Sequence, residues 1–369
     1  MFAWIDWVTG SAGRFAGKPG RAGFGLAVAL MVADGTATPV LAWDYEVHRL
    51  INQLALESLP TNYPAFVREP AAAERLAFLG GEPDRWRNTP DLHLRHCNGP
   101  DHFLDIEDLA LYGLAPERLT AFRYELVAQL AEGRIRYASN FAQVDFSRDL
   151  DRTRWLPGFL PWTIAEYYSK VKSAYSCLRE FEAAGTAEER RNAQENIIAF
   201  MGIMGHFVGD ATQPLHTTRH YNGWVGPNPR GYTTSRGFHA WIDGGFLRVA
   251  GVDTNALRAR LRTARTPWPE SPLPNTNCFP EALAYVLAQS RFVEPLYQME
   301  LQGHFKTNQP MSEVGRDFLG DQILKAAQML GDLWLAAWQE APEDKFLKNE
   351  LARRKSGSRT NKSGSSANP

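Results

Sequence analysis

The chain has 369 residues, of which 44% are hydrophobic and 12% aromatic, which indicates a globular protein of one or two domains. Forty basic and 41 acidic residues leave a net charge of −1. This excludes a protein whose overall positive charge attracts nucleic acid or an anionic membrane. Three scattered cysteines allow at most one disulfide and lack the spacing of a thiolate zinc site.

Residues 1–42 have the pattern of an export signal. Basic residues precede an apolar run at 24–33, and the small residues Val40 and Ala42 stand shortly before Trp43. We expect cleavage after Ala42 and therefore a secreted or periplasmic protein. A membrane anchor is the alternative, but the apolar run is well short of the roughly 20 residues that a spanning helix needs.

Helical patterns dominate the chain after this segment. Apolar residues recur at three- and four-residue steps over 50–59, 282–301 and 315–339, and no comparable run alternates with period two. Connectors rich in proline and glycine lie around residues 79–100, 157–161, 223–237 and 267–280.

We therefore predict an all-α fold with one mainly helical domain at residues 43–342. The remaining residues, 343–369, end in a stretch of serine, glycine and basic residues without apolar periodicity. Because this composition buries too little surface to order itself, we expect a disordered basic tail there.

The segment MGIMGHFVGDATQPLH, residues 201–216, carries the strongest chemical signal. His206 and Asp210 are four residues apart and project from one side of an otherwise apolar helix, so both would reach one metal ion. Pro214 should end this helix, which places His216 on the turn just beyond it.

A second pair, His239 and Asp243, repeats the four-residue spacing. A single His-x-x-x-Asp pair is more often a salt bridge or a helix cap than a metal site. Two such pairs together with His216 favour a metal, because imidazole and carboxylate on apolar helices are costly to bury unless something satisfies them. These are the ligands of catalytic zinc, which keeps one position open for water.

The segment HFVGDATQPLH, the later His-x-x-x-Asp and a tryptophan at the expected mature N-terminus together resemble a known zinc-dependent family. That family unites fungal-type single-strand nucleases with bacterial phospholipases C. The matched features run from Trp43 to Asp243, with a closing helix at 315–339. The resemblance implies a single helical catalytic domain of this type that holds three zinc ions (three Zn²⁺).

Carried over residue by residue, the resemblance implies nine metal ligands in three groups. They are Asp84, His102, His206 and Asp210 for one zinc; the α-amino nitrogen and carbonyl oxygen of Trp43 with His48 and the bridging Asp210 for its partner; and His216, His239 and Asp243 for the third. Since only a freed α-amino group can bind a metal, cleavage before Trp43 would complete the second group.

The assignment of Asp84 has alternatives. Asp84 precedes His102 by slightly more residues than the family pattern does, Asp91 and Asp101 lie nearby, and Asp84 would also serve as a helix N-cap. His102 lies in HFLD, which resembles the family's His-Phe-x-Asp stretch. The histidines that match no ligand position, and that we expect to be ordinary surface or loop residues, are His93, His96, His220 and His304.

The resemblance implies hydrolysis of phosphate esters by a metal-activated hydroxide. Water between two zinc ions would lose its proton near neutral pH and attack phosphorus, and the third zinc would stabilise charge on an oxygen. Catalysis is therefore assigned to Asp84 and Asp210, which would hold the zinc pair. Acid should inactivate the enzyme, because protonation of histidine below about pH 6 competes with zinc.

Two residues beside His102 are candidates for substrate binding. Phe103 corresponds to a position where the nucleases stack a base; core packing is the alternative. Asp105 would orient a metal ligand or a bound water, or make a structural hydrogen bond.

We expect single-stranded nucleic acid or a nucleotide as substrate, because the interval from His216 to His239 resembles that of the nucleases. A phospholipid headgroup is the alternative, because Gly-Gly-Asn is missing after His216 and Ile242 replaces a family tryptophan. Trp224 and Tyr232 in this loop would serve a lipid or a base equally.

A helical protein with purely structural zinc is the third alternative. Structural sites usually close with four protein ligands, often cysteines, whereas the group of His216, His239 and Asp243 has three ligands and no thiolate. This ligand set favours an open, catalytic metal. The sequence indicates no obligate protein partner.

Overall fold

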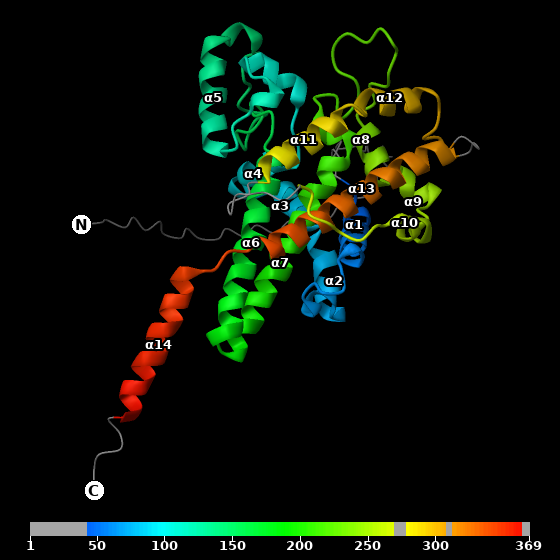
Figure 1. The fold of residues 1–369 in the computed structure, drawn as a ribbon. Helices are drawn as coiled ribbons and strands as arrows, with labels where there is room; N and C mark the ends of the chain where they lie inside the picture. Colours follow the sequence, from blue (N-terminus) through cyan, green and yellow to red (C-terminus); the bar gives the residue numbers. More distant parts are fainter. Residues whose placement is uncertain (1–42, 269–277, 308–311, 364–369) are drawn as a thin grey trace, which may run out of the picture. The chain divides into compact units, whose positions relative to one another are not determined.

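The computed structural model describes residues 43–268, 278–307 and 312–363, so the expected export signal lies outside the described residues. Within these ranges every regular element is a helix and no strand occurs, which confirms the all-α prediction (Figure 1). None of the described helices combines the length and apolar character needed to cross a bilayer.

The α-helices are α1 (Tyr45–Ser58), α2 (Pro70–Leu79), α3 (Glu82–Asn88), α4 (Leu92–Asn98), α5 (Arg123–Arg136), α6 (Leu160–Ala184), α7 (Ala187–Thr212), α8 (Phe238–Ala240), α9 (Phe246–Ala250), α10 (Thr254–Arg260), α11 (Phe279–Ser290), α12 (Val293–Leu301), α13 (Ser312–Gln339) and α14 (Lys345–Ser363). Short 3-10 turns at Gly99–His102 and Pro214–Thr217 and a π-helical turn at Trp241–Gly245 complete the elements that matter for the site.

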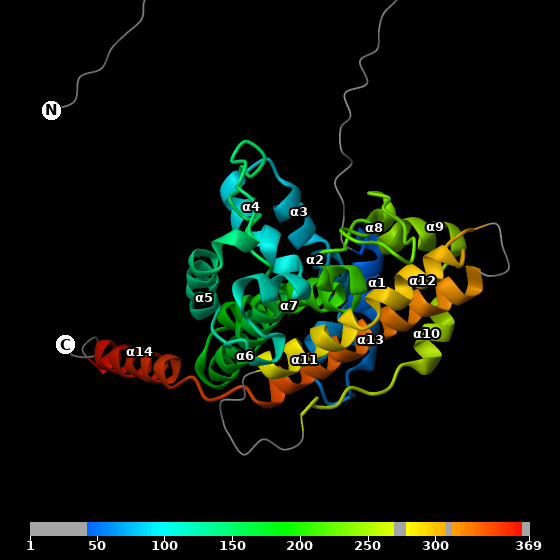
Figure 2. The same ribbon diagram turned by 90° about the horizontal axis from the view of Figure 1, so that it is seen from above.

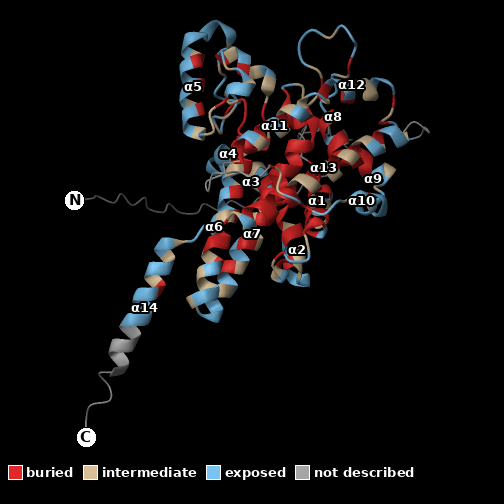
Figure 3. Ribbon diagram, in the orientation of Figure 1, coloured by how far each residue is buried: buried red, intermediate tan, exposed pale blue. Residues whose placement is uncertain are grey.

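Helices α1, α7 and α13 pack against one another in all three pairings and form the buried centre of the domain (Figures 1 and 3). Helix α6 lies along α7, to which a two-residue turn joins it (Figure 2). The C-terminal half of α7 is buried almost without interruption from Met201 to Thr212. The sequence segment with the strongest chemical signal is therefore in the core.

The ends of α7 follow from its sequence. Thr186 and Glu189 form a capping box, in which each side chain accepts a hydrogen bond from the backbone N–H of the other residue. The helix ends at Thr212, two residues before Pro214, as predicted. His216 then lies in the 3-10 turn that follows, also as predicted.

Glycines on α7 let α1 approach closely. A Cβ atom at Gly205 would lie 1.7 Å from the side-chain oxygen of Asn52, and one at Gly209 would lie 2.9 Å from Nδ1 of His48. Both partners are on α1. The absence of side chains at these two positions therefore brings His48 against the helix that carries His206 and Asp210.

Two local expectations are corrected. The stretch 79–100, expected to be a connector, contains α3 and α4. Their charged residues hid the helical pattern, although Pro83 stands in the first turn of α3 and Asp91 caps α4 through its side chain. The apolar run 282–301 is split into α11 and α12. The cysteine count allowed at most one disulfide, and all three cysteines are unpaired.

The expectation of a disordered tail at 343–369 is also corrected over the described part of that stretch, because α14 covers Lys345–Ser363; residues 364–369 lie outside the described residues. The side chain of Asp344 accepts a hydrogen bond from the backbone N–H of Leu347 near the start of the helix. Leu351 is buried, and Arg354 forms an ion pair with Glu189 of α7 at 2.7 Å. Composition alone missed this cap and the buried Leu351.

Candidate metal centre

Asp210 of α7 lies at the meeting point of several imidazoles. One carboxylate oxygen is 2.9 Å from Nδ1 of His102 and 3.2 Å from Nε2 of His206. The other is 3.5 Å from Nε2 of His48. All four side chains are completely buried. The spacing of His206 and Asp210 on one helix thus places them together, as predicted, and tertiary packing adds residues from α1 and from the turn Gly99–His102.

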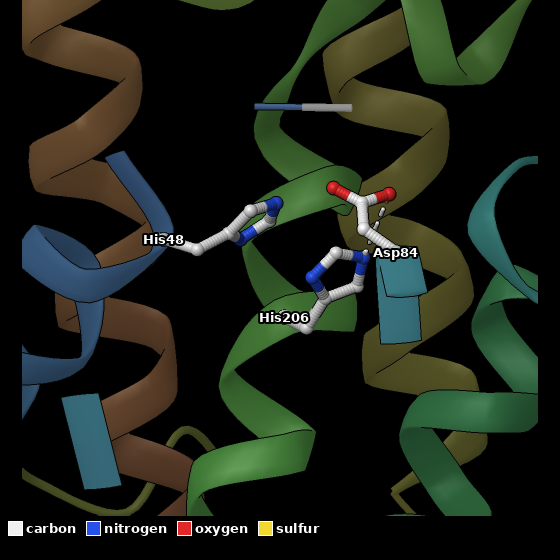
Figure 4. A group of neighbouring side chains, drawn as sticks. All are labelled: His48, Asp84 and His206. Carbon is white, nitrogen blue, oxygen red and sulfur yellow. Dashed lines mark ion pairs between the residues drawn. The ribbon is translucent and has the colours of Figure 1, made fainter. Parts of the chain in front are cut away.

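His48, Asp84 and His206 converge from three helices (Figure 4). The rings of His48 and His206 stack with centroids 4.0 Å apart. One oxygen of Asp84 is 3.9 Å from Nε2 of His206 and 4.0 Å from Nδ1 of His102. One ligand atom from each of His48, Asp84 and His206 lies within 4.8 Å of the others, and the same holds for the set of His102, His206 and Asp210.

The position of Asp84 decides between the alternatives left by the sequence. Asp84 lies inside α3, whose N-cap is Gly81, so it is not an N-cap residue. Asp91 caps α4 and is exposed. Asp101 is buried but pairs with Arg123 at 2.6 Å. Of the three carboxylates, Asp84 is the one that the structure brings to the histidines.

His216, His239 and Asp243 form a third group of close, buried donors. Nε2 of His239 is 3.0 Å from Nε2 of His216 and 2.8 Å from a carboxylate oxygen of Asp243. His239 lies in α8 and Asp243 in the π-helical turn that follows it. The other oxygen of Asp243 accepts a hydrogen bond from the side-chain amide of Gln213 at 2.7 Å.

Backbone carbonyls fix which ring nitrogens carry hydrogen. Nδ1 of His206 is 2.7 Å from the carbonyl oxygen of Gly80, and Nδ1 of His216 is 2.6 Å from that of His102. A carbonyl only accepts, so each Nδ1 must donate, and each neutral ring keeps a lone pair on Nε2. These lone pairs face other nitrogens and carboxylate oxygens at about 3 Å, an arrangement that a cation would satisfy.

The titration of most groups favours their metal-binding forms, which are neutral imidazole and ionised carboxylate. Burial lowers the pKa of His102 and that of His239 to about 3, so both rings are neutral near pH 7. Burial opposes ionisation of Asp210, but neighbouring imidazoles, His206 foremost, outweigh it and hold the pKa of the carboxyl well below its usual range.

Two groups depart from this pattern. Burial raises the pKa of Asp243 well above its usual range. Burial opposes the charged form of His206, but Asp210 and Asp84 outweigh it and raise the pKa of the ring. A divalent cation would reverse both shifts, because it attracts a carboxylate and repels an imidazolium.

The cluster contains buried polar atoms without hydrogen-bond partners. Their positions and chemical types show whether metal ions would fit the cluster. Such atoms are costly in a protein interior unless a ligand satisfies them. In this cluster they are Nδ1 and Nε2 of His48, Oδ1 of Asp84, Nε2 of His102, Oδ1 of Asp210, Nδ1 of His239 and Oδ2 of Asp243. Nitrogen and carboxylate donors of this kind fit zinc.

Trp43 is completely buried beside these groups. Its indole N–H donates to the carbonyl oxygen of Gly209 at 2.9 Å, and the next residue, Asp44, donates its backbone N–H to the carbonyl oxygen of Asp243. The start of the described chain is thereby tied to the helices that carry the donors. Metal binding by the α-amino nitrogen and carbonyl oxygen of Trp43 stays a prediction.

A cleft of about 540 Å³ reaches the third donor group. His216 and His239 line it, and so do the two candidates for substrate binding, Phe103 and Asp105. Phe103 is half-buried, so part of its ring faces the cleft rather than the core. Both side chains therefore stand where a ligand of the metal centre would lie.

Arg87 and Tyr221 are among the cleft residues that the sequence analysis missed. Arg87 follows Asp84 by one helical turn, and its Nε is 3.2 Å from the Asp84 carboxylate. The i, i+3 spacing on α3 was the available signal. Tyr221 also lines the cleft and is 46% exposed. No sequence pattern distinguished it from its neighbours in the loop.

The expectation that Tyr232 would offer its ring to a substrate is wrong, whereas Trp224 is half-buried and its role stays a prediction. Tyr232 is 3% exposed, and the rings of both residues pack against Tyr297 of α12 with centroids 5.2 and 5.6 Å away. His220 stacks on Trp224 at 4.0 Å. These aromatic residues hold the loop in place and lie outside the lining of the cleft.

The fold and the site together define a helical protein with a buried cluster of histidine and aspartate side chains suited to metal ions. No protein-family model matches the chain, and a comparison with curated proteins finds no significant relative. Among solved structures the chain is similar to the alpha-toxin of Clostridium perfringens from the avian strain SWCP, with 13% identity and a TM-score of 0.33.

The match covers 81% of this chain and 65% of the toxin chain, so this chain spans less than two thirds of the toxin's length. A likeness at this level says nothing about activity. The function is therefore argued from the geometry of the site itself.

Proposed function

We propose that this protein is a zinc-dependent phosphoester hydrolase that acts on single-stranded nucleic acid or nucleotides. The observation that carries the proposal is the convergence of buried imidazole and carboxylate donors with unsatisfied atoms. Two of the donors, His216 and His239, line a cleft. Burying so many polar groups without ligands would be costly, and the donor set suits zinc. Purely structural zinc is disfavoured because the third group opens into the cleft.

Bound zinc ions would lower the pKa of water and stabilise negative charge on phosphoryl oxygens. The chain's own residues prepare the site for this chemistry. The carbonyl oxygens of Gly80 and His102 fix the tautomers of His206 and His216. Gln213 orients the carboxylate of Asp243 by a hydrogen bond. No side-chain nucleophile is required.

The walls of the cleft support an anionic substrate with a planar group. Arg87 supplies a guanidinium beside Asp84, which suits a phosphate. Phe103 and Tyr221 offer aromatic faces on which a base would stack. A phospholipase is the second candidate, because exposed apolar side chains near the cleft would contact a lipid surface. These are Phe146 and Leu150, which are 63% and 57% exposed and lie on the segment that leads to the cleft residue Thr153.

Parallel assays on single-stranded DNA, RNA and phosphatidylcholine vesicles test the proposal. We expect nucleotide release by the zinc-loaded protein and its loss in His239→Ala. The matched control is His93→Ala, which removes an exposed histidine of α4 and should leave activity unchanged. Phosphocholine release would move the assignment to a phospholipase, and no hydrolysis of any substrate would contradict the proposal.

A further inference from the structure

A second hollow of about 380 Å³ adjoins the cleft at the metal centre. The two hollows share Asp105, Arg154 and Leu156 in their walls, so they adjoin. The residues that line the second hollow come from the end of α5, the turn Ile106–Tyr112 and the segment 141–157. Each hollow has the size of a small-ligand pocket, about 300–1,000 Å³.

Three arginines line the second hollow: Arg134 at the end of α5, and Arg148 and Arg154 on the following segment. We call this hollow the arginine groove. Among the residues that the structure describes, Arg134 and Arg154 form no ion pair within 4.0 Å. Arg148 pairs with Asp145 at 3.4 Å, but both side chains are exposed, so the pair holds the guanidinium weakly.

Aromatic rings hold Arg134 in place. Its guanidinium lies 5.5 Å from the ring centroid of Phe141 and 5.8 Å from that of Trp155. Tyr112 packs on Phe141 at 4.7 Å, and its hydroxyl donates to the carbonyl oxygen of Trp155. Guanidinium groups interleaved with aromatic rings are the combination by which proteins bind single strands without reading sequence.

Three carboxylates also line the arginine groove and weigh against an anion. Asp108 pairs with Arg219 at 3.2 Å, and Asp145 pairs with Arg148, so both charges are partly balanced. Burial, with the nearby Asp108 and Glu107, raises the pKa of Asp105 well above its usual range, which reduces its negative charge. The arginines therefore dominate the charge that a ligand meets.

We propose that the arginine groove binds the nucleotide and phosphate next to the ones at the metal centre, so that the enzyme prefers polynucleotides over mononucleotides and small diesters. This inference rests on the proposed function and names its substrate more closely. A lipid headgroup would have no second phosphate to place in the groove. The preference should therefore grow with chain length until both hollows are filled.

Activity on substrates of different length tests the groove in the full chain. We expect Arg134→Ala to lower kcat/KM on a ten-residue oligo(dT) by about tenfold, with no change on bis(p-nitrophenyl) phosphate, because Arg134 lines the groove and not the cleft at the metal centre. Arg154 lines both hollows, so Arg154→Ala should lower kcat/KM on oligo(dT) by at least as much. The matched control is Arg136→Ala on the same helix, because Arg136 pairs with Glu132 at 2.5 Å and does not line the groove. Arg134→Lys and Arg154→Lys, which keep the charge, should recover most of the loss.

Binding without turnover separates this inference from the proposed function. With metal removed by chelator, the anisotropy of labelled oligo(dT) gives log Kd against log salt concentration. The slope should fall by about 0.7 in Arg134→Ala and in Arg154→Ala, and stay unchanged in the control Arg136→Ala. If the wild type hydrolyses DNA but all three variants behave alike, the groove is wrong and the hydrolase stands. If nothing is hydrolysed but the slopes change as expected, the groove stands and the hydrolase is wrong.

Discussion

Replacing Asp210 by Asn removes one negative charge from the centre of the cluster and keeps the shape of the side chain. The carboxylate lies 2.9 Å from His102, 3.2 Å from His206 and 3.5 Å from His48, so three imidazoles from separate elements depend on it. Changing a residue that only supports a ligand costs about 10–100-fold in metal affinity. We expect the loss of this shared carboxylate to weaken zinc binding by at least about 100-fold and to abolish hydrolysis.

Zinc affinity by competition with a chromophoric chelator measures the effect, and circular dichroism shows that the helices remain. The matched control is Asp332→Asn, since Asp332 is also a buried aspartate, lies on α13 and pairs with Arg262 at 3.1 Å. This control should lower thermal stability without changing zinc affinity. Wild-type zinc affinity and hydrolysis in a folded Asp210→Asn protein would refute the reasoning.

Three further predictions follow from individual contacts. In Gly209→Ala the new Cβ would lie 2.9 Å from Nδ1 of His48, so the imidazole ring must shift. We expect thermal unfolding to show about 1–3 kcal/mol of destabilisation and elemental analysis to show a lower zinc content. An unchanged zinc content would count against the close approach. In the metal-free protein, burial lowers the pKa of His102 and that of His239 from 6.5 to about 3, so the unfolded chain binds more protons at these two sites between these values. Among the metal donors, the raised pKa of Asp243 acts in the opposite direction within this window, but at one site only. Stability should therefore fall as pH falls through this window, and a constant Tm in EDTA from pH 7 to 4 would contradict it. Phe103→Ala should lower kcat/KM on oligonucleotides by about 5- to 150-fold and spare bis(p-nitrophenyl) phosphate; equal effects on both substrates would indicate a packing role instead.

Local sequence patterns predicted those parts of the site that one helix determines. His206 and Asp210 lie on one face because they are four residues apart, and Pro214 ends their helix. The next turn then presents His216 from a different direction. These features depend on helical geometry and on the backbone of proline, both of which can be read from the sequence.

Contacts between distant segments could not be derived in this way. Asp84 reaches the histidines because α3 packs against α7, and nothing in its own surroundings excluded an N-cap role. Tyr232 was expected to face a ligand, but Tyr297 from α12 covers it. The resemblance to a family supplied the grouping of ligands, whereas the packing of separate helices determines their distances.

The π-helical turn Trp241–Gly245 was also beyond prediction. It begins two residues after His239 and contains Asp243, and the two side chains still meet at 2.8 Å. Within this turn, a Cβ atom on Gly244 would lie 2.0 Å from a carboxylate oxygen of Asp44, so Asp44 approaches the backbone of the turn closely. The turn thus depends on an approach between residues 200 positions apart, which no local periodicity records.

The most direct test of the account is the zinc content of the protein purified after expression of the full chain, measured by elemental analysis alongside hydrolysis of single-stranded DNA. We predict three zinc ions per chain, loss of hydrolysis on chelation and its return when zinc is added. A protein that is folded but holds no stoichiometric metal, and that hydrolyses nothing after zinc is supplied, would contradict the metal-centre account.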